Sequence, residues 1–435
     1  MSDDSQTSDD PTPEVHASGE RHGSGDTRPE MATHEVLALI AAGKPVENVR
    51  VRRLKLKGEF PTTVAFKNCA LVQPEFGAAT FKADLTFVGC YLDRPSFAKP
   101  VTVEGNFGLN GSTVSKSRFS QLTVVGKAFF SGAEFRGKAY FEKCEFRQKV
   151  SWWEAKLECW GEFKACGFHQ EADFRSIHCD QGLIFTGCTF RDDFLLRGAT
   201  VQKKFQADGC RFEKLFDISK AKLHDFVYLE GIEQGPEMRF AFANAVAERL
   251  LVRPEQVEGR LASEVAGQPE QAMHEYGLLK KCYQGQHRFN DEDWAFYRFK
   301  VNQRLATPAT WNRPWTKVRR FCDWLFLDIG CGYGTNPARA VRMAVVIILG
   351  FATLYGVGVE EFHAEKKPFP DDEITDTSNR VMIGLITSVS VFTSGMGGIR
   401  EIAKGWMNVP VMVESVLGTL LFGLFIVAFS RKVIR

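Results

Sequence analysis

Six residues near the carboxyl end combine hydroxyl groups and glycines in a pattern suited to ion conduction. They are Thr393, Ser394, Gly395, Met396, Gly397 and Gly398. Glycine lets successive backbone carbonyls turn toward one axis, where their oxygens can replace the hydration shell of a cation. Such irregular backbone is tolerated at membrane depth only where it lines a water-filled cavity or is buried in protein. The segment therefore predicts an ion-conduction filter, on condition that neighbouring segments supply membrane spans.

Apolar runs on both sides of these six residues supply the elements that must hold them. Residues 343–359 carry no charge and residues 407–430 carry one, Glu414, so each run is long and apolar enough to cross a bilayer as a helix. Residues 381–392 are apolar but too short to cross. We expect a pore domain with a re-entrant P-loop over residues 341–430. Its parts are a span at 341–359, a pore helix at 381–392, the filter at 393–398 and a span at 407–430.

The charges that flank the two spans predict their orientation. Basic residues lie before the first span and after the second, and acidic residues outnumber basic ones between 360 and 380. Cytoplasmic loops carry an excess of lysine and arginine. We therefore expect a multi-pass protein of the cell (inner) membrane with both termini in the cytoplasm.

The order of span, short helix, glycine-rich segment and span resembles the two-span potassium-channel pore family, whose filter reads T-V-G-Y-G-D. Three positions are identical to that filter, namely Thr393, Gly395 and Gly397. Three differ, with Ser394 for Val, Met396 for Tyr and Gly398 for Asp. The resemblance implies a homotetramer that conducts monovalent cations, K⁺ or Na⁺, because each chain supplies a quarter of the filter. The replaced side chains leave both a potassium-selective filter and a weakly selective cation pore open.

Three residues of the second span are candidates for roles in such a pore. Gly418 and Gly423 would serve either as gating hinges or as sites of close helix packing. Glu414 would either brace the pore helix through Ser388 or Ser390, or lie near the outer interface and contact water. The sequence leaves both pairs of alternatives open.

Large apolar residues, most of them phenylalanine, recur at a fixed step from about residue 60 to 231. Two interleaved series, one through Phe135 and Phe146 and the other through Phe130 and Phe141, each advance by 11 residues. Small residues that alternate beside them make the full period 22. Equivalent residues stacked one strand spacing apart are typical of a solenoid. Runs such as GAEF, KCEF and EADF resemble the pentapeptide-repeat family, and the resemblance implies its right-handed β-helix.

Four cysteines recur at one position of this repeat. They are Cys144, Cys166, Cys188 and Cys210. The chain brings neither a C-x₂₋₄-C spacing nor histidines at fixed offsets, so we interpret these thiols as small buried residues and predict no metal site. We also predict no catalytic constellation and no cofactor, hence no enzyme. The net charge of +2 on 435 residues argues against a nucleic-acid partner.

The remaining segments complete a multidomain organisation. Ahead of the pore domain we expect a disordered tail at 1–32, a cap at 33–59 with a short helix at 34–42, the pentapeptide-repeat β-solenoid at 60–231, a helical connector at 236–306 with helices at 240–251, 270–287 and 291–305, and an interfacial amphipathic helix and turn at 311–335.

The sequence LDIGCGYG at 327–334 suggests an alternative function. It resembles the glycine motif of class I methyltransferases, and the resemblance implies a strand, a loop that binds S-adenosylmethionine and a role for Asp328. The other interpretation is that Gly330, Gly332, Gly334 and Pro337 end the interfacial helix and start the first span.

Altogether the sequence favours a membrane cation channel. Its cytoplasmic solenoid would regulate gating or bind an unknown cytoplasmic protein or ligand. The alternatives are a membrane-anchored pentapeptide-repeat scaffold that does not conduct, and the methyltransferase.

Overall fold

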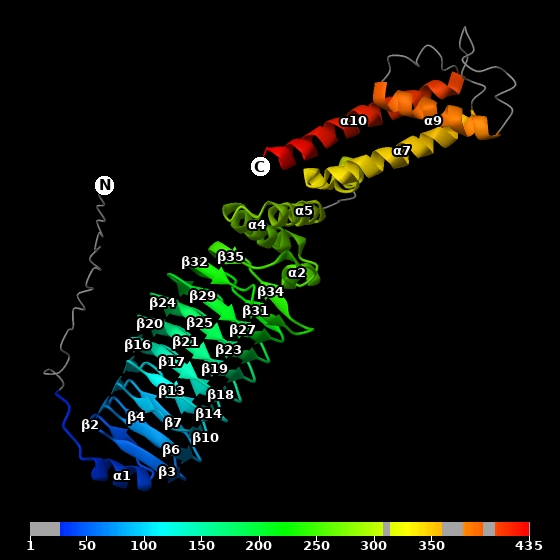
Figure 1. Ribbon diagram of the computed structural model, residues 1–435. Helices are drawn as coiled ribbons and strands as arrows, with labels where there is room; N and C mark the ends of the chain where they lie inside the picture. Colours follow the sequence, from blue (N-terminus) through cyan, green and yellow to red (C-terminus); the bar gives the residue numbers. More distant parts are fainter. Residues whose placement is uncertain (1–26, 308–313, 359–376, 395–404, 435) are drawn as a thin grey trace, which may run out of the picture.

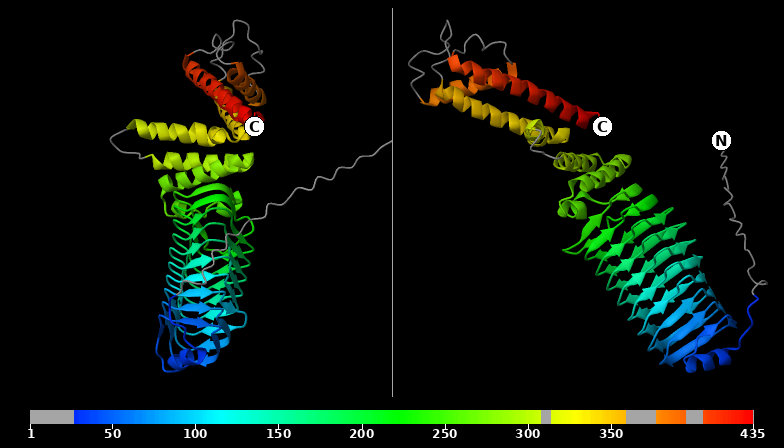
Figure 2. Two further views of the ribbon diagram at one scale, coloured as in Figure 1. Left: turned by 90° about the vertical axis from the view of Figure 1, so that its left-hand side faces the viewer. Right: turned by 180° about the vertical axis from the view of Figure 1, so that it is seen from behind.

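The computed structural model describes residues 27–307, 314–358, 377–394 and 405–434. A β-solenoid occupies the amino-terminal part of the chain, a group of helices covers one of its ends, and the carboxyl-terminal helices lie beyond them (Figure 1; Figure 2).

The solenoid consists of two stacks of short parallel strands. One stack is a ten-stranded sheet with the strand order β1-β4-β7-β11-β15-β19-β23-β27-β31-β34. Its strands are β1 (Val46–Glu47), β4 (Val64–Lys67), β7 (Leu85–Val88), β11 (Phe107–Gly108), β15 (Ala128–Phe129), β19 (Val150–Ser151), β23 (Ala172–Asp173), β27 (Phe194–Leu195), β31 (Leu215–Asp217) and β34 (Arg239–Ala241).

The other strands belong to a 25-stranded sheet that forms the remaining walls. They are β2 (Arg50–Arg52), β3 (Lys55–Phe60), β5 (Ala70–Val72), β6 (Glu75–Phe81), β8 (Tyr91–Asp93), β9 (Ser96–Phe97), β10 (Val101–Val103), β12 (Thr113–Ser115), β13 (Arg118–Ser120), β14 (Leu122–Val124), β16 (Glu134–Arg136), β17 (Ala139–Glu142), β18 (Glu145–Phe146), β20 (Lys156–Leu157), β21 (Gly161–Lys164), β22 (Gly167–Phe168), β24 (His178–Cys179), β25 (Leu183–Thr186), β26 (Thr189–Phe190), β28 (Thr200–Val201), β29 (Phe205–Asp208), β30 (Arg211–Phe212), β32 (Lys222–Tyr228), β33 (Glu233–Gln234) and β35 (Val246–Leu251).

The strand register confirms the predicted 22-residue period. Phe141 pairs with Phe163 across β17 and β21, and Phe163 pairs with Phe185 across β21 and β25. The rings stack with centroids 4.8 and 4.9 Å apart, and all three side chains are buried along the axis. Cys188 is buried in the same wall, where its thiol donates to the carbonyl of Phe163 at 3.3 Å. The fold is thus consistent with pentapeptide repeats.

The solenoid extends beyond its predicted limits at both ends. It begins at β1, inside the segment predicted as a cap, after helix α1 (Thr33–Ala41). Residues 1–26 of the predicted tail lie outside the described residues, but Met31 donates its N–H to the carbonyl of Arg50 at 2.9 Å, so the tail ends before residue 32.

The helix predicted at 240–251 is wrong, because this segment forms β34 and β35. Phe240 pairs with Phe216 and Ala247 with Leu223, so the last coil is longer than 22 residues. In this longer coil the apolar residues no longer recur at the 22-residue period. Their spacing in the sequence is instead similar to that of an amphipathic helix.

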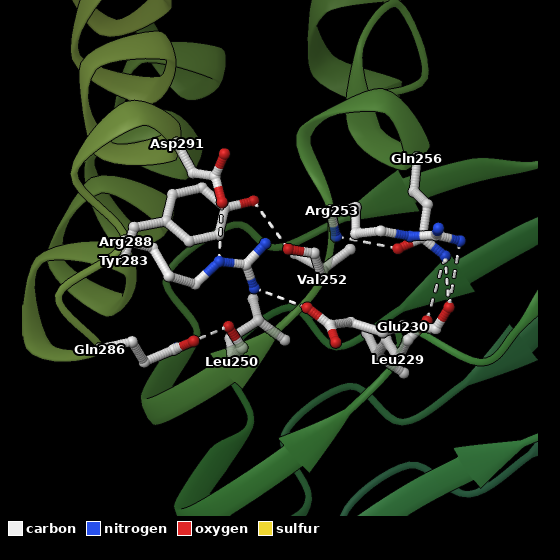
Figure 3. A network of polar contacts seen from close by, with 10 residues as sticks. All are labelled: Leu229, Glu230, Leu250, Val252, Arg253, Gln256, Tyr283, Gln286, Arg288 and Asp291. Atoms are coloured by element: carbon white, nitrogen blue, oxygen red, sulfur yellow. Dashed lines mark hydrogen bonds and ion pairs between the residues drawn. The ribbon is translucent and has the colours of Figure 1, made fainter.

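Helices cover the last coil, where strand edges would otherwise expose unpaired backbone groups. They are α2 (Pro254–Val257), α3 (Ala262–Val265), α4 (Pro269–Gly285) and α5 (Phe289–Ala306), and the last two correspond to the predicted helices at 270–287 and 291–305. Figure 3 shows the contact: Tyr283 donates to the carbonyl of Val252 and Gln286 to that of Leu250, each at 3.0 Å. Arg288 pairs with Glu230 at 2.6 Å. We keep the name connector for these four helices, α2 to α5. The connector is fixed to the solenoid by side chains that form hydrogen bonds to backbone carbonyls and by this ion pair.

A buried carboxylate on α4 completes this contact. Glu275 accepts hydrogen bonds from the N–H of Phe242 at 2.9 Å and from the hydroxyl of Ser263. Burial raises the pKa of the Glu275 carboxyl above its ordinary value.

The rest of the described chain is helical. It consists of α6 (Pro314–Cys322), the π-helix η1 (Asp323–Ile329), the 3₁₀ turn η2 (Gly332–Gly334), α7 (Pro337–Val357), α9 (Thr377–Ser394), the 3₁₀ turn η5 (Gly405–Met407) and α10 (Asn408–Val433). Two helical segments, Pro337–Val357 and Gly405–Val433, are long and apolar enough to cross a membrane. α9 is longer than the pore helix predicted at 381–392.

Candidate functional site

The predicted filter is only partly within the described residues. Thr393 and Ser394 form the carboxyl end of α9, and the hydroxyl of Thr393 donates to the carbonyl of Val389 at 2.7 Å. The other predicted filter residues, Gly395, Met396, Gly397 and Gly398, lie outside the described residues. The described helices that flank the predicted filter in the sequence are α7, α9 and α10, which lie side by side (Figure 1).

Close backbone contact holds α9 against α7. A Cβ added at Gly384 would overlap the carbonyl of Ala352 and would lie 2.8 Å from the nitrogen of Gly356. One turn further along α9, the hydroxyl of Ser388 donates to the carbonyl of Ile348 at 2.9 Å. Residue numbers in these contacts rise along α9 while they fall along α7, so the two helices are antiparallel.

The two glycines predicted as hinges or packing sites differ in their surroundings. A Cβ added at Gly418 would overlap the carbonyl of Phe392, near the end of α9. At Gly423 no atom of the described chain lies within 4 Å of such a Cβ. Gly418 therefore permits a close approach between α9 and α10, whereas Gly423 makes no such contact within one chain.

A buried carboxylate joins all three helices. Glu414 on α10 is fully buried and accepts hydrogen bonds from the hydroxyl of Tyr355 on α7, at 2.6 Å, and from the hydroxyl of Ser388 on α9. Contact with Ser388 is one of the two arrangements that the sequence left open. Sequence reasoning missed Tyr355, although a carboxylate within an apolar helix requires a donor on a neighbouring helix.

A second polar cluster lies where the connector meets α7. The carboxylate of Asp328 on η1 accepts from the hydroxyl of Tyr297 at 2.8 Å and pairs with Arg304 at 2.7 Å, both on α5. Arg339 on α7 donates to the Asp328 carbonyl at 3.1 Å. Asp328 thus ties α5, η1 and α7 together.

The same segment lacks the strand that the methyltransferase resemblance implies. That alternative requires a strand before the glycines, but Asp323–Ile329 is a π-helix and the side chain of Asp328 is held by the connector. The glycine sequence forms a turn instead, with positive φ at Gly332, Tyr333 and Gly334. Asn336 then caps α7 by accepting from the N–H of Ala338 at 3.1 Å, so the predicted turn between two helices is confirmed.

The connector also holds the carboxyl end of α10. Arg431 pairs with Asp293 at 3.0 Å and Glu292 at 3.7 Å, both in the first turns of α5, and its guanidinium lies over the ring of Phe296 at 4.2 Å. Lys432 lies 4.0 Å from Asp293. One helix, α5, therefore contacts the start of α7 and the end of α10. Sequence reasoning gave no signal for this contact, because the paired residues are far apart in the chain.

The class that these observations define is a β-solenoid joined through helices to two apolar helices that are long enough to cross a membrane. Comparison with protein-family models, with curated proteins and with solved structures finds no match for this chain.

Proposed function

We propose that this chain is one subunit of a homotetrameric membrane channel for monovalent cations, K⁺ or Na⁺. In this proposal α7 and α10 are the spans, α9 is the pore helix, and residues 393–398 of four chains line the filter. The basic residues that flank the spans support an orientation in which both termini and the solenoid would lie in the cytoplasm.

The contact between the carboxyl end of α9 and the middle part of α10 is the observation that carries the proposal. Phe392 contacts Gly418, which lies about 15 Å along α10 from Asn408 at 1.5 Å per residue. The hydrocarbon core of a bilayer is about 30 Å thick, so α9 would end near its middle. Because η5 (Gly405–Met407) leads into the start of α10, which would lie on the outer side, the chain between Ser394 and Gly405 would return to the side from which it came. A helix that enters to half depth and returns is what a re-entrant pore loop requires.

The polarity of α9 suits a cation. The carboxyl end of a helix carries about half a negative charge, and here it would face the centre of the membrane, where an ion is least hydrated. Glycine carbonyls immediately after it could then coordinate the ion. Glu414 would brace α9 from behind through Ser388, with Tyr355 as its second donor.

The surfaces of the spans agree with contact to lipid or to further subunits. Val346 on α7 and Phe422 on α10 are 64% and 65% exposed in the single chain. Exposed apolar surface of this kind is typical of membrane or subunit contacts.

The π-helix and α6 agree with a position at the membrane interface. α6 runs crosswise to α7 and α10 (Figure 2), and Trp315 and Phe321 are 82% and 57% exposed. Aromatic side chains beside basic ones are typical of helices that lie in this interface.

The connector would transmit movement of the solenoid to the pore. α5 holds the inner ends of both proposed spans, through Asp328 and through Arg431. A ligand or partner that shifted the solenoid would therefore pull on both span ends at once.

Currents from the purified protein in planar bilayers under K⁺ and Na⁺ gradients test the proposal. We expect cation currents that Gly395→Ala abolishes and Gly350→Ala preserves, because a Cβ added at Gly350 meets no described atom within 4 Å. Equal currents in both variants would contradict a filter at 393–398. Wild-type protein that gives no current and has the mass of a monomer in detergent would favour the scaffold.

A further inference from the structure

A cavity of about 570 Å³ lies where α5, the α6–η1 segment and the inner end of α10 meet. Its polar side carries the cations Lys300, Arg304 and Arg319 and the hydroxyl of Tyr333, and one carboxylate, Asp323, also faces it. Its other side is apolar and includes Leu424 and Val427 of α10. The cavity is thus a positively charged recess with an apolar wall.

Two donors in this lining are buried without an acceptor. Asp328 holds one side of the Arg304 guanidinium at 2.7 Å, but its Nη1 is buried and has no hydrogen-bond partner within the described chain. The hydroxyl of Tyr333 is also buried and lacks a partner there. Burial raises the pKa of Tyr333 to about 12, so this hydroxyl remains protonated and able to donate at neutral pH.

Unpartnered buried donors call for an acceptor, and the cations that line this recess favour one with negative charge. Phosphate suits them, because guanidinium groups and hydroxyls donate to its oxygens and several donors can share one group. A free phosphate would leave the apolar wall without a partner. The wall lies on the last turns of α10, and Val427 is 62% exposed there.

We propose that this cavity binds the phosphate head group of an anionic phospholipid of the inner leaflet. Arg304, Arg319 and Tyr333 donate to the phosphate, and the acyl chains run along Leu424 and Val427. The proposal rests on the membrane placement in the proposed function, but not on conduction. A lipid held in this cavity touches the connector and α10 together, so it stabilises the contact that links the solenoid to the second span.

Titration of the full-length protein in phosphatidylcholine nanodiscs with phosphatidylglycerol, followed by native mass spectrometry, tests the site. We expect saturable binding that Arg319→Gln and Tyr333→Phe each weaken by about tenfold or more, the effect of one lost hydrogen bond to a charged group. Arg320→Gln is the matched control: it removes the same charge from the same helix but does not line the cavity, so affinity should stay within about twofold. Arg304 is left unchanged because Asp328 depends on it.

Three results would overturn the site. Equal losses in Arg319→Gln and Arg320→Gln would mean general attraction to a negative surface. Glycerol phosphate or inorganic phosphate that binds as tightly as the lipid would mean a soluble ligand. Protein that fails to enter nanodiscs would refute the membrane placement, and the lipid site with it. Loss of currents with lipid binding intact would refute only the channel.

Discussion

The solenoid and the bundle of α7, α9 and α10 reach a defined structure by opposite means. In the solenoid the same kind of contact recurs from coil to coil, as in the stack of Phe141, Phe163 and Phe185, and backbone groups pair with the coils above and below. In the bundle each decisive contact occurs once, as at Glu414 and Gly418. A repeated contact leaves a period in the sequence from which the fold can be predicted. A contact that occurs once leaves no such pattern and is identified only in the structure.

The largest effect on stability is expected at the solenoid axis. Phe163→Ala removes a fully stacked ring and leaves a cavity between two neighbours, which costs about 3–5 kcal/mol of unfolding free energy. Denaturant unfolding of the full chain, with hydrogen exchange to localise the change to coils 141–185, would measure it.

Lys164→Ala is the control for this variant, because Lys164 is exposed on the same strand. It should change stability by less than about 0.5 kcal/mol. A small effect of Phe163→Ala would show that neighbouring coils collapse to fill the space, and that repetition protects the solenoid.

In the bundle the corresponding test compares two glycines of one helix. Gly418→Ala places a methyl group against the Phe392 carbonyl and should cost about 1–3 kcal/mol through displacement of α9. Gly423→Ala meets no described atom within 4 Å and should be neutral, or stabilise α10 by up to about 1 kcal/mol. Thermal unfolding in detergent measures both. A greater loss of thermal stability in Gly423→Ala than in Gly418→Ala would instead indicate that Gly423 contacts another subunit.

A double-mutant cycle tests whether Glu414 joins the helices. Tyr355→Phe and Glu414→Gln each perturb the hydrogen bond between these residues, and we expect a coupling of about 1 kcal/mol, typical of polar contacts between membrane helices. Strictly additive losses in thermal stability would show that the two side chains act independently.

The smallest effect is a dependence on pH at the contact between the connector and the solenoid. Because burial raises the pKa of Glu275, the native state holds this proton more tightly than the unfolded state does. Stability from this group should therefore be complete below the ordinary carboxyl pKa of about 4.3 and decrease as pH rises through the raised native value. Melting curves at several pH values should show this decrease in the wild type but not in Glu275→Gln. If the melting temperatures of the wild type and Glu275→Gln changed with pH in parallel, Glu275 would be excluded as the cause of the pH dependence.

The difference between the two regions also explains what the sequence could predict. The 22-residue period predicted the strand stack, and the apolar runs predicted both long helices. The same period misplaced the solenoid's end, because the coil that pairs Phe216 with Phe240 is longer than the others. The partners of Glu414, Asp328 and Arg431 could not be predicted as sets, because they join residues with no fixed spacing.

Thiol labelling of intact cells tests most directly whether the chain that enters the membrane as α9 returns to the same side before α10 begins. Asn379→Cys lies at the start of α9 and Asn408→Cys at the start of α10, and an impermeant reagent should label both from outside. Ser430→Cys, near the end of α10, should react only after the cells are opened. Labelling of residues 379 and 408 from opposite sides would mean that α9 crosses the membrane completely, and the re-entrant pore would be refuted.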